Sequence, residues 1–371
     1  MAVSVVLLVG FVLLSVAGYG RSQTYNAIYN FGDSITDTGN LCTGGCPSWL
    51  TTGQLPYGDT YFGRPTGRCT NGRVIVDFLG TSIYLNSAPD HFGLPLLPPS
   101  KASGSDFKKG ANMAIIGATT MDFGFFQSLG LGNSIWNNGP LDTQIQWFQQ
   151  LMPSICGSDC KSYLNNSLFI VGEFGGNDYN APLFGGKSIT EVKGYVPQII
   201  DKITNGVETL IGLGAVDMVV PGVLPIGCFP LYLTLYQSSN QDDYDENGCL
   251  KSFNSLSVYH NGLLKQGLAS VQSKYPAVRL MYGDFYSQVT QMVQSPGSFG
   301  LKYGLKVCCG ASGQGSYNYN NQARCGMSGA SACGDPENYL VWDGIHLTEA
   351  AYRSIADGWL RGPYSSPTIL Y

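Results

Sequence analysis

The spacing of hydrophobic residues alternates along the chain, and this alternation limits the fold more than any other feature of the sequence. Short apolar runs typical of buried strands are followed by longer segments with an apolar residue every three or four positions, as in amphipathic helices. The expected strands cover residues 27–31, 112–118, 167–174, 216–220 and 278–282. The expected helices cover residues 74–83, 141–151, 192–211, 244–275 and 348–359. This order predicts the α/β class, a parallel sheet covered by helices on both faces.

The N-terminal segment has the composition of a secretory signal peptide. Residues 1–20 carry no charged side chain, and residues 3–16 are almost entirely apolar. We expect cleavage between positions 18 and 23; an uncleaved Golgi anchor is the alternative, although the apolar run is shorter than the ~20 residues of a spanning helix. Residues 25–371 are expected to form a single domain. The predicted location is extracellular or in a cell wall, with the Golgi or ER lumen as the alternative and no stable membrane insertion after cleavage.

The eleven cysteines indicate an oxidising compartment. We expect the neighbours Cys156 and Cys160 to pair, and Cys228 to pair with Cys249. Further bridges are expected within the late group Cys308, Cys309, Cys325 and Cys333. A zinc site is the alternative, but no CxxC pair is present and the chain has only three histidines. The odd number leaves at least one thiol free or paired outside the chain.

Two further features bear on partners and processing. The net charge is −5, and Lys108-Lys109 is the only adjacent basic pair. Nucleic-acid binders normally carry a basic patch, so no nucleic-acid partner is expected. Asn165 begins the sequence Asn-Asn-Ser, which is an N-glycosylation site in secreted proteins.

Ser34 is placed where an α/β sheet carries chemistry. It follows the expected strand 27–31 and Gly32, which permits a tight turn. Open α/β sheets bind their ligands at the carboxyl ends of strands, and backbone N–H groups there can stabilise an oxyanion. Taken alone, a serine in such a turn more commonly caps a helix.

His346 is the histidine with the most suggestive neighbour. His91 lies in a loop, His260 lies within an expected helix, and His346 follows Asp343 by three residues. A carboxylate at this spacing can hold the imidazole Nδ1 and turn Nε2 towards a serine. The same spacing also fits a simple helix N-terminus, which Thr348 could cap as well.

Asn177 and Gly72 are candidate donors to an oxyanion. Each follows a turn at the end of an expected strand or the start of an expected helix. Turn chemistry alone would also explain both residues, because Asn and Gly are common in turns.

Four short motifs occur in a fixed order. They are GDS at 32–34, NGR around Gly72, GGND at 175–178 and DGIH at 343–346. The fuller strings FGDSITDTGN, NGRVIVDF, GGNDY and WDGIHLTEAAY resemble the plant branch of the GDSL esterase/lipase family, which belongs to the SGNH hydrolases. The resemblance spans about residues 25 to 361. The G-x-S-x-G elbow of ordinary α/β-hydrolases is absent.

The resemblance implies a flavodoxin-like three-layer α/β/α sandwich with a five-stranded parallel sheet. It implies a carboxylic ester hydrolase with Ser34 as nucleophile, His346 as base and Asp343 orienting His346. The backbone N–H groups of Ser34 and Gly72 and the amide of Asn177 would form the oxyanion hole. No metal or organic cofactor is implied, and Asp33 is expected to be structural.

The natural ester is left open by the sequence. The expected substrate is a small-molecule or polysaccharide ester, with short acyl groups such as acetyl on a plant polysaccharide or metabolite. One alternative is an acyltransferase that uses the same serine. Another is a non-catalytic cell-wall or carbohydrate-binding protein that has kept the fold.

Overall fold

A computed structural model of the chain describes residues 24–80 and 92–370. The expected signal peptide, His91 and the last residues of the first expected helix lie outside these ranges. Within them, no helix combines the length and hydrophobicity that crossing a membrane requires.

The central sheet has the strand order β10-β5-β4-β3-β1-β2. β1 to β5 are parallel, and β10 joins the edge of β5 in the antiparallel direction. The order 2-1-3-4-5 of the parallel strands is that of flavodoxin-like sheets, so the expected fold class is confirmed. The strands are β1 Ala27–Phe31, β2 Gly110–Asn112, β3 Ser167–Val171, β4 Asp217–Pro221, β5 Arg279–Gly283 and β10 Ser365–Ser366.

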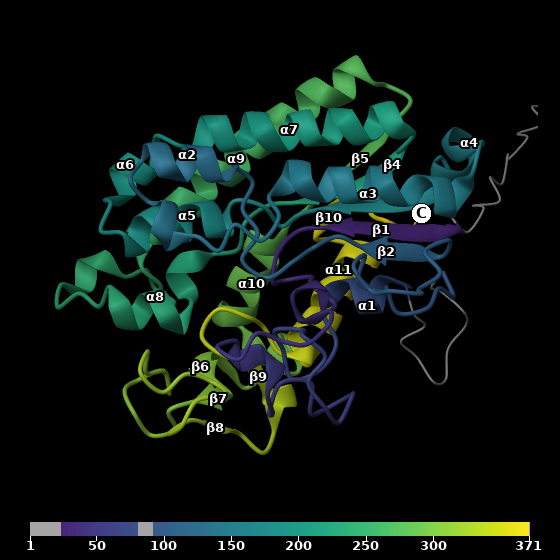
Figure 1. Cartoon of the computed structure of the whole chain (residues 1–371). Helices are drawn as coiled ribbons and strands as arrows, with labels where there is room; N and C mark the ends of the chain where they lie inside the picture. Colours follow the sequence, from purple (N-terminus) through teal and green to yellow (C-terminus); the bar gives the residue numbers. More distant parts are fainter. Residues whose placement is uncertain (1–23, 81–91, 371) are drawn as a thin grey trace, which may run out of the picture.

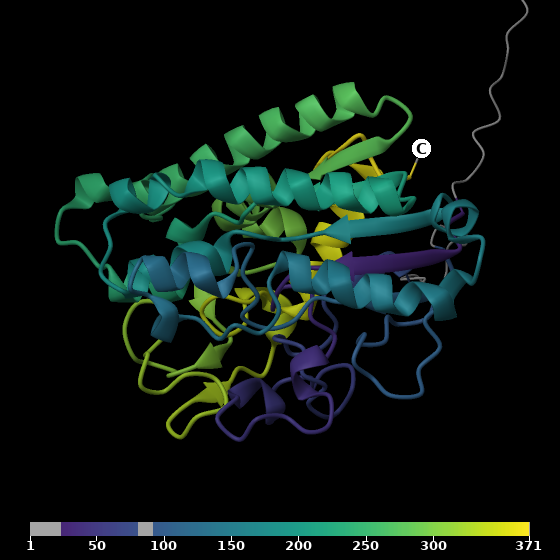
Figure 2. The ribbon, with the colours of Figure 1, turned by 45° about the horizontal axis from the view of Figure 1, so that its top comes forward.

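Helices cover both faces of the sheet, which makes three layers (Figures 1 and 2). α3 (Leu141–Cys156), α7 (Val196–Leu213) and α9 (Lys251–Lys274) lie on one face. α1 (Ile75–Gly80), α10 (Phe285–Gln294) and α11 (Glu349–Arg361) lie on the other. β1, β3 and β4 are buried along their whole length, as expected for strands covered on both sides. The remaining helices are α2 Phe123–Ser128, α4 Cys160–Leu164, α5 Gly176–Phe184, α6 Ile189–Lys193 and α8 Pro230–Leu235.

The expected strand at 112–118 is wrong in its position. β2 ends at Asn112, and the following apolar residues leave the sheet although they remain buried. Met113 N–H donates to Asn30 O at 2.7 Å, and Ile115 N–H donates to Gly32 O at 3.2 Å. This segment therefore packs against the end of β1 and the loop that follows it, and most of its hydrophobic residues are buried outside the sheet.

The other differences concern element boundaries. The helix expected at 244–275 begins only at Lys251, because the preceding residues form a turn that is tied down by a disulfide. The stripe at 192–211 divides into α6 and α7 near Gly194. The segment that holds the late cysteines, for which no strand was expected, contains the short strands β6 Tyr303–Val307, β7 Cys309–Gly310, β8 Ser331–Ala332 and β9 Tyr339–Val341.

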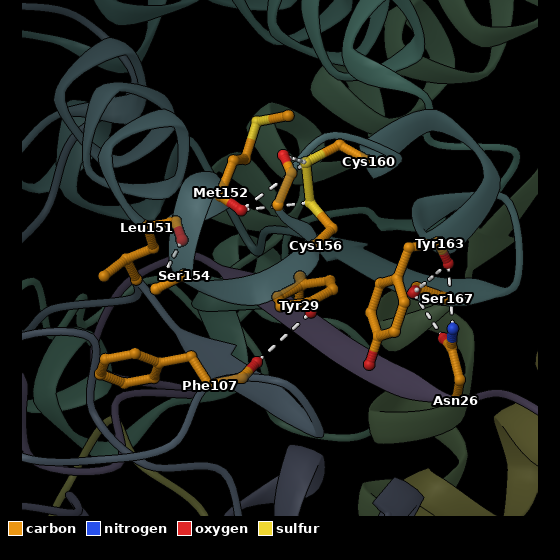
Figure 3. Close-up of a disulfide and its surroundings, with 11 residues drawn as sticks. Asn26, Tyr29, Phe107, Leu151, Met152, Ser154, Cys156, Cys160, Tyr163 and Ser167 are labelled. Atoms are coloured by element: carbon orange, nitrogen blue, oxygen red, sulfur yellow. Dashed lines mark hydrogen bonds between the residues drawn. A yellow bond between two sulfur atoms is a disulfide. The ribbon is translucent and has the colours of Figure 1, made fainter.

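The disulfides each close a short stretch of the chain, between 4 and 25 residues long. The expected bridges Cys156–Cys160 and Cys228–Cys249 are confirmed, and the first closes the connection between α3 and α4 (Figure 3). Cys69 is the free thiol and is buried. The remaining bridges are Cys42–Cys46, Cys308–Cys333 and Cys309–Cys325.

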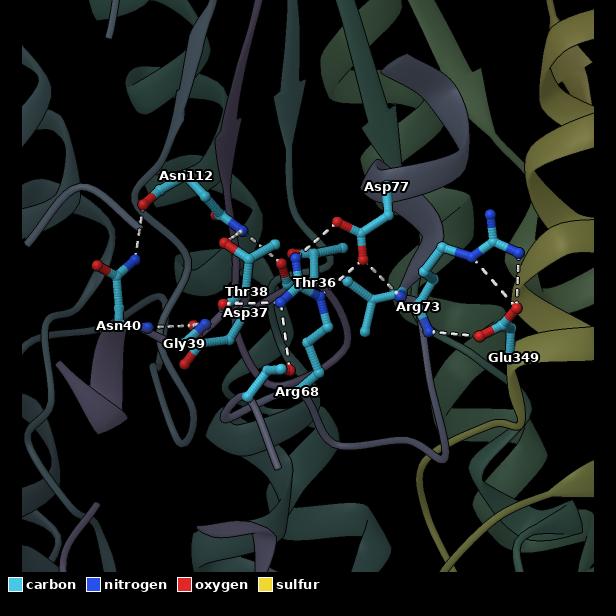
Figure 4. A network of polar contacts seen from close by, with 12 residues as sticks. Thr36, Asp37, Thr38, Gly39, Asn40, Arg68, Arg73, Asp77, Asn112 and Glu349 are labelled. Atoms are coloured by element: carbon cyan, nitrogen blue, oxygen red, sulfur yellow. Dashed lines mark hydrogen bonds and ion pairs between the residues drawn. The ribbon is translucent and has the colours of Figure 1, made fainter. Parts of the chain in front are cut away.

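A buried ion pair fixes the loop that precedes α1 (Figure 4). Arg68 binds both oxygens of Asp77 at 2.7 Å, and the two side chains are 6% and 0% exposed. Asp77 also accepts the N–H of Val74 at 2.9 Å. Removing one member leaves the other charge buried without its partner, which costs far more than breaking a surface pair.

Asp77→Ala is therefore expected to lower the free energy of unfolding by about 3–5 kcal/mol, measured by urea denaturation. Asp357→Ala is the matched control, because it breaks the exposed pair between Arg361 and Asp357. We expect the control to cost at most about 1 kcal/mol. Equal losses in the two variants would contradict the special cost of the buried pair.

Candidate active site

The turn after β1 is held in place by Gly32 and Gln144. Gly32 has φ +152°, and a Cβ there would lie 2.8 Å from both Gly172 O and Thr36 Oγ1, so only glycine fits. The buried Gln144 of α3 accepts the Gly32 N–H at 2.9 Å and donates to Gly32 O at 2.8 Å. These contacts fix the backbone two residues before Ser34.

Buried polar side chains also fix the residues that follow Ser34 (Figure 4). The Asp37 carboxylate accepts the N–H groups of Gly39 at 2.7 Å and Ile116 at 2.9 Å. Burial raises the pKa of Asp37 to about 6, while these backbone hydrogen bonds act in the opposite direction. Asn112 at the end of β2 donates to Thr36 O at 2.6 Å. The loop is therefore held by side chains where regular secondary structure is lacking.

Ser34, His346 and Asp343 form a continuous chain of hydrogen-bonding groups. His346 Nε2 lies 2.8 Å from Ser34 Oγ, and His346 Nδ1 lies 2.8 Å from Asp343 Oδ2. Asp343 Oδ1 also accepts the His346 N–H at 3.0 Å, which closes the turn between β9 and α11. Tyr57 donates its hydroxyl to Asp343 Oδ2 at 2.7 Å. The residues expected from the two ends of the sequence thus meet in space.

The electrostatics of this group favour a charged Asp343. Burial alone would raise the pKa of Asp343, but the facing His346 and the hydrogen bonds from His346 and Tyr57 lower it. Burial alone would lower the pKa of His346, but the Asp343 carboxylate, together with the neighbouring Cys69 side chain, outweighs it and raises that pKa well above the ordinary value. A proton on Nδ1 is thereby held towards Asp343, and Nε2 is directed at Ser34.

The segment around Gly72 is joined to the start of α11 (Figure 4). Glu349 accepts from the Arg73 guanidinium and from the Arg73 N–H, at 2.7 Å and 2.8 Å. The Glu349 N–H donates to Asn71 Oδ1 at 2.8 Å. A Cβ on Gly72 would overlap the Glu349 carboxylate, so the close approach requires glycine. These contacts anchor α11, and with it His346, to the early part of the chain.

Asn177 lies in the first turn of α5, beside the Ser34 loop. Its Nδ2 donates to Asp33 Oδ2 at 2.7 Å and to Ala118 O at 2.9 Å. Asp33 also accepts the N–H of Ile35 at 2.9 Å. Burial raises the pKa of Asp33 to about 7, while the Ile35 N–H acts in the opposite direction. Asp33 therefore connects the loops after β1 and β3.

A pocket of about 290 Å³ opens beside these groups, and Ser34, Asn177 and His346 line it. Polar groups at its wall include Asp33, Glu173 and Asn180. Most of the remaining wall is aliphatic or aromatic: Ile35, Ile116, Ile135, Trp136, Phe184, Leu224, Ile226, Phe229, Tyr232 and Ile345. An apolar pocket with a few convergent polar groups is the usual form of a small-molecule site.

Not all the expected residues share this pocket. Gly72 packs against Glu349 and is not among the lining residues. His260 is fully buried in α9 with Nδ1 2.6 Å from the Tyr179 hydroxyl, which is a structural contact. Asn165 is exposed directly after α4.

Sequence reasoning missed Tyr57 and Glu173. Tyr57 comes from a loop rich in Gly, Pro and aromatic residues, and nothing in that composition pointed to Asp343. Glu173 lies just before the GGND motif, and this position was the one feature of the sequence that could have marked it as a site residue.

Comparisons with known proteins agree with the resemblance. A family model described as GDSL-like Lipase/Acylhydrolase matches residues 28–359. A GDSL esterase/lipase of Arabidopsis thaliana is 44% identical over 353 residues, which cover 93% of this chain and 92% of the relative. The chain belongs to the GDSL lipase/acylhydrolase family.

Another relative in the comparisons is an esterase. This GDSL protein is 40% identical over 354 residues to the sinapine esterase of Brassica napus, covering 94% of this chain and 88% of that protein. A crystal structure of phospholipase A1 from Streptomyces albidoflavus aligns with 90% of this chain and 96% of its own, at 12% identity and a TM-score of 0.37. The family and its curated plant relatives make the GDSL protein a carboxylic ester hydrolase.

Proposed function

We propose that the GDSL protein hydrolyses esters through an acyl intermediate on Ser34. The observation that carries this proposal is the 2.8 Å separation of Ser34 Oγ and His346 Nε2, with Asp343 on the far side of the imidazole. Ser34 Oγ attacks the ester carbonyl carbon while its proton passes to His346 Nε2. His346 then protonates the departing alcohol, and water attacks the acyl group with His346 again as base.

The oxyanion of the tetrahedral intermediate needs donors close to Ser34. We assign this role to the N–H groups of Ser34 and Gly72 and to the amide of Asn177, although Gly72 does not line the pocket. Asn177 lines the pocket, but its amide protons are directed at Asp33 and Ala118. Its contribution therefore requires one of these hydrogen bonds to be exchanged for the oxyanion.

The proposed setting is the secretory pathway and the cell exterior. The disulfides and the exposed Asn165 are consistent with it. The proposed substrates carry short acyl groups, such as acetyl, on a plant polysaccharide or metabolite. An acyltransferase is the second candidate, because an alcohol could replace water in the last step. Measuring how the acyl group partitions between water and an added alcohol separates the two.

The first prediction concerns the nucleophile. Ser34→Ala should lower kcat by about 10⁴- to 10⁶-fold, since it removes the oxygen that carries the acyl group in the proposed intermediate. Asn177→Ala should cost roughly 10²- to 10³-fold. Hydrolysis of p-nitrophenyl acetate measures both, with circular dichroism to verify folding. Wild-type activity in purified Ser34→Ala would contradict the assignment.

The second prediction concerns pH. Because Asp343 raises the pKa of His346, kcat/KM should rise with pH and reach half its plateau above pH 6.5, as His346 loses its proton. Asp343→Asn should move that midpoint to lower pH and reduce kcat by about 10³- to 10⁴-fold. Asp357→Asn, in an exposed pair, is the control and should leave the profile unchanged. An unmoved midpoint in Asp343→Asn would argue against this arrangement.

The third prediction concerns chain length. Among p-nitrophenyl esters from acetate to palmitate, kcat/KM should be highest for the short acyl groups. A clear optimum at long chains would refute the short-acyl proposal without affecting the role of Ser34.

A further inference from the structure

Glu173 places a carboxyl group in the pocket wall that the proposed reaction does not use. It lies between the end of β3 and the start of α5 and is 3% exposed. Its Oε1 accepts the Gly176 N–H at 3.0 Å. Within the described part of the chain, Oε2 has no hydrogen-bond partner. One oxygen is therefore occupied by the backbone, and the other is available to whatever enters the pocket.

The surroundings of Glu173 disfavour its charged form. Burial raises the pKa of Glu173 well above its ordinary value, and the carboxyl groups of Asp33 and Asp178 raise it further, against the Gly176 N–H. The other titratable groups on this side are His346, which lines the same pocket, and the Tyr179 and Tyr232 hydroxyls, and behind Tyr179 lies His260. Burial lowers the pKa of His260 to about 3, so this imidazole supplies no positive charge at neutral pH. These surroundings favour the neutral form of Glu173, and because Oε1 accepts the Gly176 N–H, Oε2 is the oxygen that would hold the proton in that form.

The rest of the pocket limits which group of a ligand can accept a hydrogen bond from Glu173. Trp136, Phe184 and Phe229 supply aromatic walls, and Tyr232 donates its hydroxyl to Asn180. The volume of about 290 Å³ is several times what an acetyl group fills. The pocket therefore suits a mainly apolar group of the size of a substituted ring. Its aromatic side chains would pack against the ring, and Glu173 would donate a hydrogen bond to one oxygen on it.

We propose that Glu173 determines substrate specificity by donating a hydrogen bond from Oε2 to a hydroxyl oxygen on an uncharged aromatic group of the ester. This inference rests on the proposed function for turnover, but it concerns binding in the pocket and not the chemistry at Ser34. A pocket lacking the donor would lose its preference for the hydroxylated group, because a buried hydroxyl without a partner is costly.

The test uses matched esters with and without a ring hydroxyl. Hydroxyphenyl acetates are compared with phenyl acetate, and methyl 3-(hydroxyphenyl)propanoates with methyl 3-phenylpropanoate, each with meta and para hydroxyls. The ratio of kcat/KM for the hydroxylated and plain esters is measured in wild type, Glu173→Gln and Glu173→Leu. Glu246→Leu removes an exposed carboxyl group and is the control.

Wild type should prefer the hydroxylated member of at least one pair. Glu173→Leu should lower that ratio by about 2- to 12-fold. Glu173→Gln should retain it, since its amide N–H can donate from the same place, and the control should match wild type. The wild-type ratio should fall as pH rises and Glu173 loses its proton, while that of Glu173→Gln stays level. Titration of His346 affects both esters and cancels in the ratio.

Two outcomes would overturn the inference. Equal kcat/KM ratios in wild type, Glu173→Gln and Glu173→Leu would show that Glu173 does not bind the ring hydroxyl. A loss in Glu173→Gln as large as in Glu173→Leu would show that the carboxyl acts as an anion. The failure of Ser34 as nucleophile is distinguishable, because the same esters can be titrated calorimetrically into Ser34→Ala. The ratio of their Kd values with and without the Glu173 substitutions then tests the pocket alone.

Discussion

The contact between Ser34 Oγ and His346 Nε2 is the interaction on which the account of this protein depends. The two residues are separated by 312 positions, so neither local sequence can bring them together. The hydrogen bonds of the NGR segment to the start of α11 do so, through Glu349, Asn71 and Arg73. Thr70 adds a bond from its hydroxyl to Leu347 O at 2.8 Å. The NGR segment, whose Gly72 N–H is the proposed donor to the oxyanion, thus also holds the start of α11 against the early part of the chain.

Buried carboxyl groups gather at the carboxyl ends of the first and third strands. Asp33 follows β1, and Glu173 and Asp178 follow β3, all buried. Asp178 accepts the N–H groups of Thr120 and Met121 at 2.7 and 2.9 Å, whereas Glu173 has one such bond. Buried acids with few partners are costly to ionise and are common at functional sites. The difference in their partners separates a structural role for Asp178 from the binding role proposed for Glu173.

The fold could be predicted where burial and secondary structure coincide. β1, β3, β4 and β5 lie close to their expected positions because each is a short apolar run inside the sheet. The run at 112–118 was wrongly predicted as a strand because most of its residues are buried against the end of β1 and the following loop, and hydrophobicity alone does not distinguish this environment from a sheet. The bridges Cys156–Cys160 and Cys228–Cys249 were predicted, Cys42–Cys46 was not, and the pairing of Cys308 with Cys333 and Cys309 with Cys325 depends on the path of an irregular loop.

The candidate site was predictable only where its contacts join residues that are close in the sequence. The aspartate and histidine of DGIH lie on one turn, so their contact follows from spacing. The hydroxyl of Tyr57 reaches Asp343 across 286 positions through a loop without regular structure, and no periodicity signals it. The pocket wall combines side chains from several loops, and its shape follows only from the assembled fold.

The central claim is that Ser34 is the hydroxyl made nucleophilic by His346. Its most direct test is reaction with a fluorophosphonate, followed by peptide mass spectrometry. Loss of esterase activity should parallel formation of one adduct, located on the peptide that contains Ser34, and Ser34→Ala should remain unlabelled. An adduct on another residue that accompanies inactivation, or full activity after exhaustive treatment, would contradict the claim.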